Sequence, residues 1–146
     1  MKIEKEFIPY EQALALKELG FNEPCMMNHY GNKRLHIGRL YLPSSFGKGK
    51  NSEMYDDSLR DGDVTAVLYQ QSFRWFREKY KLEASIQRMP PEVYGKGKGG
   101  IKNYLLYIWA ENLNPRGQQT LHFDTYEEAE LECLKKLIEI VKDGKK

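Results

Sequence analysis

The stretch from Tyr69 to Lys81, which reads YQQSFRWFREKYK, limits the fold more than any other part of the sequence. On a helix, residues three and four positions apart lie on the same side, so the large aromatic residues form one stripe. The stripe consists of Tyr69, Phe73, Phe76 and Tyr80, with Leu68 and Trp75 beside it. A stripe at this spacing has to be covered by another layer of the fold. The pattern therefore predicts a core helix over about residues 65–81.

The opposite side of this predicted helix carries cations. They are Arg74, Arg77 and Lys81, and Gln70 lies among them. Glu78 can pair with Arg74 one turn back, which weakens the cationic patch. The first interpretation is a solvated helix face. The second is a contact surface for phosphate or for an acidic partner, and a nucleic-acid-binding protein would use it in the first way.

The rest of the sequence alternates between helical and strand-like patterns. Pro9 and Gly20 bracket a first helix, because proline is tolerated in the opening turn and glycine can take the left-handed position after the last one. Thr125 and Glu128 form a capping box at the start of the last helix. The remaining segments are a hairpin around Gly31-Asn32, a long loop at about 43–63, and strands at 82–89, 102–111 and 120–123.

This order predicts an α+β fold in a single domain of 146 residues. Its antiparallel sheet would consist of the hairpin and a three-stranded meander, packed with three helices. A short sequence repeat marks the three predicted helix starts. Each helix begins with a tyrosine followed by two polar residues, at Tyr10, Tyr69 and Tyr126. The repeat has two interpretations: an internal duplication, or the common need for a polar first turn.

Composition narrows the class of protein. Hydrophobic residues make up 40% and charged residues 30%, which argues against a disordered chain and against a membrane protein. The N-terminal MKIEKEFIPY lacks the apolar region of a secretion signal, and Cys25 and Cys133 are too few for a disulfide framework. We therefore expect a cytoplasmic protein. A net charge of +2 is too small to predict nucleic-acid binding by itself.

The tetrapeptide GKGK occurs twice, at 47–50 and 95–98, in two predicted loops. Glycine lets backbone amides turn toward an anion and lysine adds positive charge, so both loops could hold phosphate. Neither belongs to a Walker or dinucleotide-binding motif, and soluble hairpin tips use the same residues. Loops that lie at one end of the sheet would form a cationic, anion-binding rim. The rim residues are Lys48, Lys50, Lys96, Lys98 and Arg116.

The predicted hairpin contains a weak candidate for a metal site. A two-residue turn at Gly31-Asn32 would place Met27 opposite His36, and Cys25 and His29 would then share their face. A cysteine and two histidines supply donors for zinc or copper, but no fourth strong ligand is near in the sequence. Half-buried polar packing is the competing interpretation, and we expect no cofactor.

The evidence for a catalytic site is weaker than the evidence for a metal site. His122 and Asp124 lie at strand spacing, where the carboxylate could orient the imidazole, but no nucleophile motif accompanies them. We therefore expect no catalytic residues. An enzyme remains the third hypothesis, and it would need a pocket that holds His29, His36 or His122 with a shifted pKa.

The strand predicted at 102–111 is apolar on both faces. Tyr107 and Trp109 alternate with Leu106 and Ile108, which we expect to face the core. The two aromatic residues would then lie on a second sheet face that needs cover. A partner protein, or a second copy of the chain in a homodimer, would supply that cover.

Three runs of sequence resemble a family of small uncharacterised proteins of gut Bacteroidetes and of their phages and mobile elements. The runs are FIPYEQALALKELGFNEPC, LYQQSFRWFREKYKL and DTYEEAELECLKKLIEIVK, and the likeness covers most of the chain in the same order. The family has no assigned function. The resemblance implies a setting, namely a soluble accessory protein inside a bacterial cell that binds a host or phage protein or a small ligand.

The predicted order from Thr65 onward, helix, three strands and helix, also resembles the double-stranded RNA-binding topology. The last helix begins with TYEEAELE, which is acidic where that fold presents lysines to phosphate, so RNA binding by that route is disfavoured. The leading hypothesis is a non-enzymatic protein that binds a protein partner or a small anionic ligand through the Gly/Lys loops and a sheet face. Nucleic-acid binding through the helix cations and the GKGK loops is the alternative.

Overall fold

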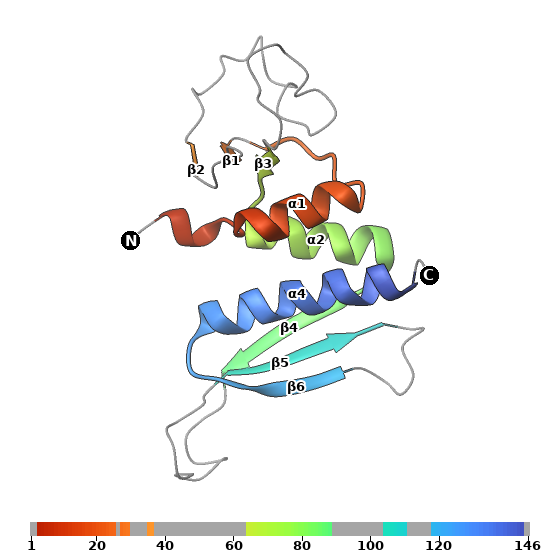
Figure 1. Ribbon diagram of the computed structural model, residues 1–146. Helices are drawn as coiled ribbons and strands as arrows, with labels where there is room; N and C mark the ends of the chain where they lie inside the picture. Colours follow the sequence, from red (N-terminus) through yellow and green to blue (C-terminus); the bar gives the residue numbers. More distant parts are fainter. Residues whose placement is uncertain are drawn as a thin grey trace, which may run out of the picture. The chain divides into compact units, whose positions relative to one another are not determined.

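The structure is a computed structural model (Figure 1). It describes residues 3–25, 27–29, 35–36, 64–88, 104–110 and 118–144. The side chains of residues 28, 35, 36 and 118–122 are outside this description. The chain forms two compact units, Met1–Tyr69 (unit 1) and Gln70–Lys146 (unit 2).

Unit 1 is built around a small antiparallel sheet. Its elements are the 3-10 helix η1 (Ile3–Glu6), the helix α1 (Tyr10–Glu18) and the strands β1 (Met27–His29), β2 (Leu35–His36) and β3 (Val64–Ala66). The strand order is β2-β1-β3, and both neighbours pair with β1 in the antiparallel direction. Phe7, Met27 and Ala66 form a buried cluster against which Leu68 packs. The middle strand β1 therefore joins segments that lie far apart in the sequence.

The ends of α1 follow from its sequence. Pro9 occupies the N-cap with φ of −62°, the value that its ring imposes. Gly20 follows the last turn with φ of 95°, and its N–H donates to the Lys17 carbonyl at 3.0 Å. The N–H of Phe21 donates to the Leu16 carbonyl at 2.9 Å, and both of these side chains are buried. These two bonds make a Schellman motif, so the predicted glycine stop is confirmed.

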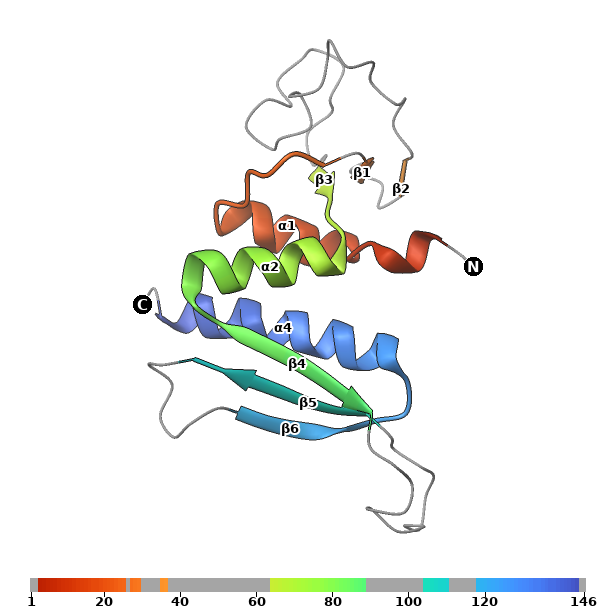
Figure 2. The same ribbon diagram turned by 180° about the vertical axis from the view of Figure 1, so that it is seen from behind.

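Unit 2 combines a three-stranded sheet with helices. The helix α2 (Tyr69–Tyr80) leads into the strands β4 (Glu83–Arg88), β5 (Tyr104–Trp109) and β6 (Gln118–Phe123), and the helix α4 (Tyr126–Gly144) ends the described chain. The strand order is β4-β5-β6, and the register between β5 and β6 shifts between Tyr104 and Leu106. The helix α4 contacts all three strands (Figures 1 and 2). The predicted α+β class is confirmed.

The start of α4 has the predicted cap. Thr125 Oγ1 accepts a hydrogen bond from the Glu128 N–H at 3.2 Å. Glu127 and Glu128 in the first turn lie at the positive end of the helix dipole, which stabilises the helix further. One side of α4 is buried, through Ala129, Cys133, Leu134, Leu137, Ile138 and Val141. The helix therefore packs through its apolar side, as its 3.6-residue periodicity predicts.

The predicted start of the second helix is wrong. Thr65 and Ala66, which were expected to be helical, belong to β3 and pair with Asn28 and Met27 of β1. Val64 through Val67 are all buried, so this segment has the continuous burial of an interior strand. The helix begins four residues later, at Tyr69.

The buried side of α2 is also slightly rotated from the predicted stripe. Tyr69, Ser72, Trp75 and Phe76 are buried, whereas Phe73 and Tyr80 are half-buried. The Trp75 ring lies edge-on to Phe76 and to Tyr80, with centroid distances of 5.1 and 5.3 Å. The aromatic cluster is therefore centred on Trp75 and Phe76, and it is a core feature as expected.

The repeated tyrosines begin α1, α2 and α4 at Tyr10, Tyr69 and Tyr126. The two intervals between them each contain three described strands, but the strand orders differ. The first sheet has the order β2-β1-β3 and the second has β4-β5-β6. This difference favours a shared chemistry of helix starts over duplication of a whole unit. Among the described residues, no helix combines the length and the apolar character needed to cross a membrane.

Candidate functional site

The two faces of β5 differ in burial. Leu106 and Ile108 are completely buried, and Tyr104, in the same alternating row, contacts the ring of Tyr126 at the start of α4 with a centroid distance of 5.9 Å. This row therefore faces α4, and the predicted core-facing role of Leu106 and Ile108 is confirmed.

The opposite row of β5 leaves aromatic side chains in solvent. Along this row the exposed fraction rises from 1% at Leu105 to 37% at Tyr107 and 51% at Trp109. The register with β4 places Ser85 across from Tyr107 and Glu83 across from Trp109. We call the surface formed by Glu83, Ser85, Gln87, Tyr107 and Trp109 the aromatic sheet face. Two large aromatic side chains exposed on one sheet face are typical of a contact surface.

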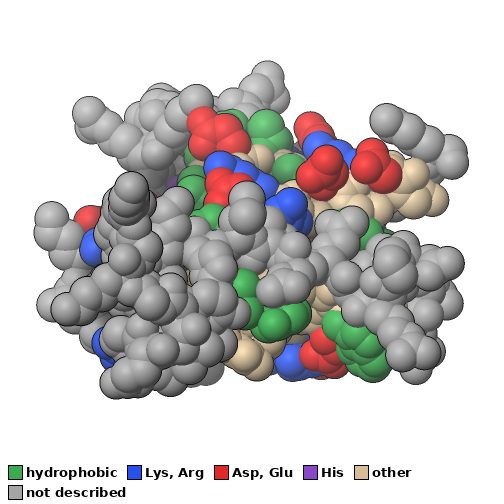
Figure 3. Space-filling model, turned by 90° about the horizontal axis from the view of Figure 1, so that it is seen from below, with side chains coloured by type: hydrophobic (Ala, Val, Ile, Leu, Met, Phe, Trp, Pro, Cys, Tyr) green, Lys and Arg blue, Asp and Glu red, His purple; other side chains and the backbone are tan. Residues whose placement is uncertain are grey.

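The charge of the aromatic sheet face is negative. Among its described residues, Glu83 is the only charged one, and Ser85 and Gln87 are polar and exposed. Cross-strand neighbours on one face have Cβ atoms about 5 Å apart, so the side chains of Glu83 and Trp109 leave the sheet at neighbouring positions. A lysine or arginine of a partner could meet both groups at once, as an ion pair and as a cation over the ring. The space-filling view shows hydrophobic side chains that reach the surface next to charged ones (Figure 3).

The cations of α2 form a second surface. Gln70, Arg74, Arg77 and Lys81 are all exposed, as the helical spacing predicts. Lys79 lies elsewhere on the helix, where its Nζ is 5.0 Å from the centroid of Trp75 and 5.5 Å from that of Tyr80. Its ammonium therefore packs over the aromatic cluster rather than adding to the exposed row.

Lys81 ends α2 in a left-handed conformation. Its φ is 57°, which a residue with a Cβ adopts only at a cost, and its N–H donates to the Arg77 carbonyl at 3.1 Å. The ammonium Nζ donates to the Glu78 carbonyl at 3.1 Å in an exposed position. The backbone bond is the usual left-handed helix stop, in which glycine is the favoured residue.

We expect Lys81→Gly to raise the free energy of unfolding by about 0.5–1 kcal/mol, because glycine removes the Cβ penalty at positive φ. The measurement is urea denaturation of the variant beside Lys81→Ala, which removes the same ammonium but keeps a Cβ. Glycine should be the more stable of the two. Equal stability would show that Lys81 is not strained.

The pairing predicted for the first hairpin, on which the group of candidate metal residues depends, is wrong. The observed register pairs His36 with Asn28 and Leu35 with His29, one residue away from the predicted pairing of His36 with Met27. A one-residue shift exchanges the two faces of a strand, so this register gives no support for placing His36 on the face of His29. The described residues contain no group of three histidine, cysteine, aspartate or glutamate side chains that could hold a metal.

His29 itself is packed in the interior of unit 1, which agrees with the interpretation of polar packing. Only 5% of the residue is exposed, and its Nε2 is 2.9 Å from the Ile8 carbonyl oxygen. The Tyr10 ring meets the imidazole edge-on at a centroid distance of 6.2 Å. The contact with Ile8 gave no signal in the sequence, because the two residues are 21 positions apart.

The two cysteines differ in environment. Cys25 is half-buried, and its thiol donates a weak hydrogen bond to the Glu23 carbonyl at 3.6 Å. Cys133 is fully buried in α4, and burial, followed by the nearby Glu130, raises the pKa of its thiol to about 12. The prediction that Cys133 is a buried, small apolar residue is confirmed.

In the native protein at pH 8, we expect Cys25 to react with a disulfide reagent at least 10-fold faster than Cys133, because the thiolate is the reactive form. The reaction is followed by absorbance, and Cys25→Ser and Cys133→Ser variants assign the two phases. Addition of denaturant should make both thiols react alike. Fast reaction of Cys133 under native conditions would contradict its burial.

Several predicted residues fall outside the described part of the chain. These are the rim residues Lys48, Lys50, Lys96, Lys98 and Arg116, the loop at 43–63 and the side chains of His36 and His122. The anion-binding rim and any role of these histidines therefore stay predictions.

We compared the chain with protein-family models, curated proteins and solved structures and found no relative. No protein-family model matches the chain, and no curated protein or solved structure gives a significant match. Within the described residues, we base a functional proposal on two surfaces, the aromatic sheet face and the exposed cations of α2.

Proposed function

We propose that the protein is a non-enzymatic binding protein that recognises a partner protein through the aromatic sheet face. The observation that carries this proposal is the exposure of Tyr107 and Trp109 on the side of β5 that faces away from α4. Tyrosine and tryptophan are enriched in protein interfaces because they bury a large apolar area with few rotatable bonds. The complementary surface is apolar and carries a lysine or arginine that meets Glu83 and Trp109.

The setting of this function is the cytoplasm of a bacterial cell, in accordance with the sequence resemblance. A host or phage protein is the partner that fits an accessory protein of this kind. A second copy of the chain is the simplest alternative partner, and a small anionic ligand would bind at the Gly/Lys loops instead.

Intrinsic fluorescence tests the self-association form of the proposal. The chain has two tryptophans, of which Trp75 is buried and Trp109 is 51% exposed. A Trp75→Phe variant makes Trp109 the single reporter of the aromatic sheet face. If a second copy covers this face, quenching by acrylamide will weaken as the protein concentration rises. Unchanged quenching, together with a monomeric mass by native mass spectrometry, would exclude the homodimer and leave a different protein as the partner.

Nucleic-acid binding through α2 is the second candidate, because Arg74, Arg77 and Lys81 are all exposed along one side of that helix. Its signature is an affinity that falls steeply with salt. If both arginines contact phosphates of a duplex, Arg74→Gln combined with Arg77→Gln should make the slope of log K against log salt about 2 units less negative. A Glu127→Gln variant serves as a control. No salt-dependent binding to DNA or RNA would remove this candidate.

A further inference from the structure

His29 occupies a central place in unit 1. It ends β1, the middle strand of the β2-β1-β3 sheet, and its register partner on β3 is Val64. Its ring reaches across to Ile8, the residue that precedes Pro9 and the start of α1. The side chain therefore connects the sheet to the segment from which α1 begins.

The hydrogen bond to Ile8 fixes which nitrogen of the ring carries a hydrogen. A carbonyl oxygen can only accept, so Nε2 is the donor in the 2.9 Å contact. The neutral imidazole then has its lone pair on Nδ1. This atom is buried, and it has no hydrogen-bond partner among the described residues. A proton added at Nδ1 would give a cation whose second N–H has no acceptor there, which is costly in a buried site.

The backbone of Ile8 is held from two sides. Its N–H donates to the Val67 carbonyl at 2.9 Å, immediately after β3, and its carbonyl accepts from His29. Phe7 pairs with Leu68 in an isolated antiparallel bridge next to these bonds. We call the set of His29, Ile8 and Val67 the Ile8 latch. Loss of the His29 bond would free the Ile8 carbonyl and loosen the start of α1 from the sheet.

The charges around His29 oppose one another. Burial has the largest effect and lowers the pKa of His29 below its ordinary value of 6.5, whereas the hydrogen bond to the Ile8 carbonyl and then the charge of Glu11 on α1 act to raise it. Tyr10 packs its phenol ring against the imidazole, and Val64, the neighbour of His29 on β3, is aliphatic. In the unfolded chain the same histidine takes up a proton at its ordinary pKa. The contribution of His29 to the stability of unit 1 is therefore fully present above pH 6.5, and it is lost as the pH falls below that value.

We propose that the Ile8 latch is an acid-sensitive switch, which holds the start of α1 on the β2-β1-β3 sheet at neutral pH and releases it when His29 is protonated. The release is local to unit 1. Unit 2 contains no described element of the latch, so its helix α4 stays protected under the same conditions. This inference does not depend on the aromatic sheet face.

Amide hydrogen exchange of the full chain, read by mass spectrometry, tests the proposal. After correction for the intrinsic effect of pH on exchange, the opening equilibrium of residues 7–16 and 64–68 should rise by up to about 30-fold between pH 8 and pH 5. Peptides from α4 are the internal reference and should change far less. Unchanged opening of both segments, or an equal change in α4, would overturn the proposal.

His29→Gln is the decisive variant. The amide nitrogen of glutamine can donate to the Ile8 carbonyl in place of Nε2, but it does not titrate, so the acid-induced rise should disappear. A rise of the same size in this variant would assign it to other groups and overturn the proposal.

Nitrogen NMR of the wild-type His29 ring gives an answer even if the variant fails to fold. At pH 6 the folded protein should hold more of the ring in the neutral form, with hydrogen on Nε2, than the unfolded chain does. Titration of the ring in the folded state at pH 6.5 or above would also overturn the proposal.

Discussion

Leu106→Ala is expected to lower the free energy of unfolding by about 2–5 kcal/mol, one of the two largest effects we predict for a single substitution in this chain. Leu106 is completely buried in β5, in the row that faces α4. The truncation removes apolar contacts and leaves a cavity that the rigid pairing of β4, β5 and β6 can fill only in part. Urea denaturation followed by circular dichroism measures the loss.

Trp109→Ala on the same strand is the matched control for Leu106→Ala. Trp109 is the larger side chain, but it is 51% exposed on the aromatic sheet face, so its truncation should cost less than about 1 kcal/mol. Because buried and exposed side chains alternate along β5, we predict that Leu106→Ala lowers the free energy of unfolding more than Trp109→Ala, although it removes fewer atoms. Equal losses, or a larger loss for Trp109→Ala, would show that the two faces are assigned wrongly.

Phe76→Ala is expected to lower the free energy of unfolding by about 3–5 kcal/mol. Phe76 is completely buried, and its ring contacts both Trp75 and Tyr80. Its loss removes the centre of the aromatic cluster that packs α2. The measurement is again denaturation by urea, with near-ultraviolet circular dichroism as a second probe of the aromatic packing.

Arg77→Ala, at the neighbouring position, controls for a general effect of substitution in α2. Its side chain is exposed, so the change should stay within about 0.5 kcal/mol. A loss below about 1 kcal/mol for Phe76→Ala would contradict the assignment of Phe76 to the core.

The features that the sequence predicts well depend on residues close together in the chain. The stop of α1 at Gly20 and the cap of α4 at Thr125 are local hydrogen-bond patterns, and both are present. The alternation of Leu106 with Tyr107 follows from the two-residue period of a strand. The exposed aromatic pair on β5 could therefore be recognised from the sequence alone.

The features that the sequence predicts poorly depend on long-range pairing. Val64, Thr65 and Val67 are β-branched and favour a strand, but they directly precede the helical pattern from Tyr69, and the pairing of residues 64–66 with β1 decides their conformation. The register of β1 with β2 differs by one residue from the pairing that a two-residue turn at Gly31-Asn32 would impose. The observed register gives no support for the predicted grouping of His36 with His29. The bond from His29 to Ile8 joins residues 21 positions apart, so it could not be foreseen.

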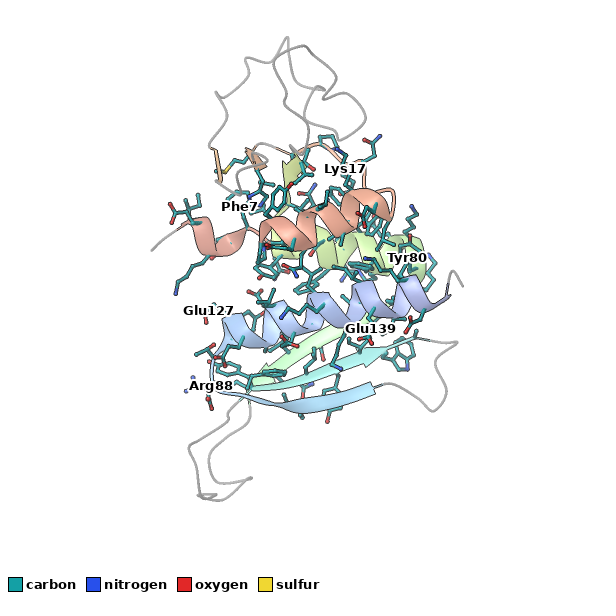
Figure 4. All side chains as sticks on the ribbon, in the orientation of Figure 1. Phe7, Lys17, Tyr80, Arg88, Glu127 and Glu139 are labelled. Atoms are coloured by element: carbon teal, nitrogen blue, oxygen red, sulfur yellow. The ribbon has the colours of Figure 1, made fainter. Side chains whose placement is uncertain are left out.

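The central claim is that the aromatic sheet face binds a partner protein, and site-specific photo-crosslinking in cells that express the chain tests it most directly. A photoreactive phenylalanine replaces Tyr107 in one variant and Glu139, an exposed residue of α4, in another (Figure 4). We predict a discrete protein adduct from position 107, none from position 139, and loss of the adduct when Trp109→Ala or Glu83→Lys is added. Equal crosslinking from both positions, or none from position 107, would contradict the claim.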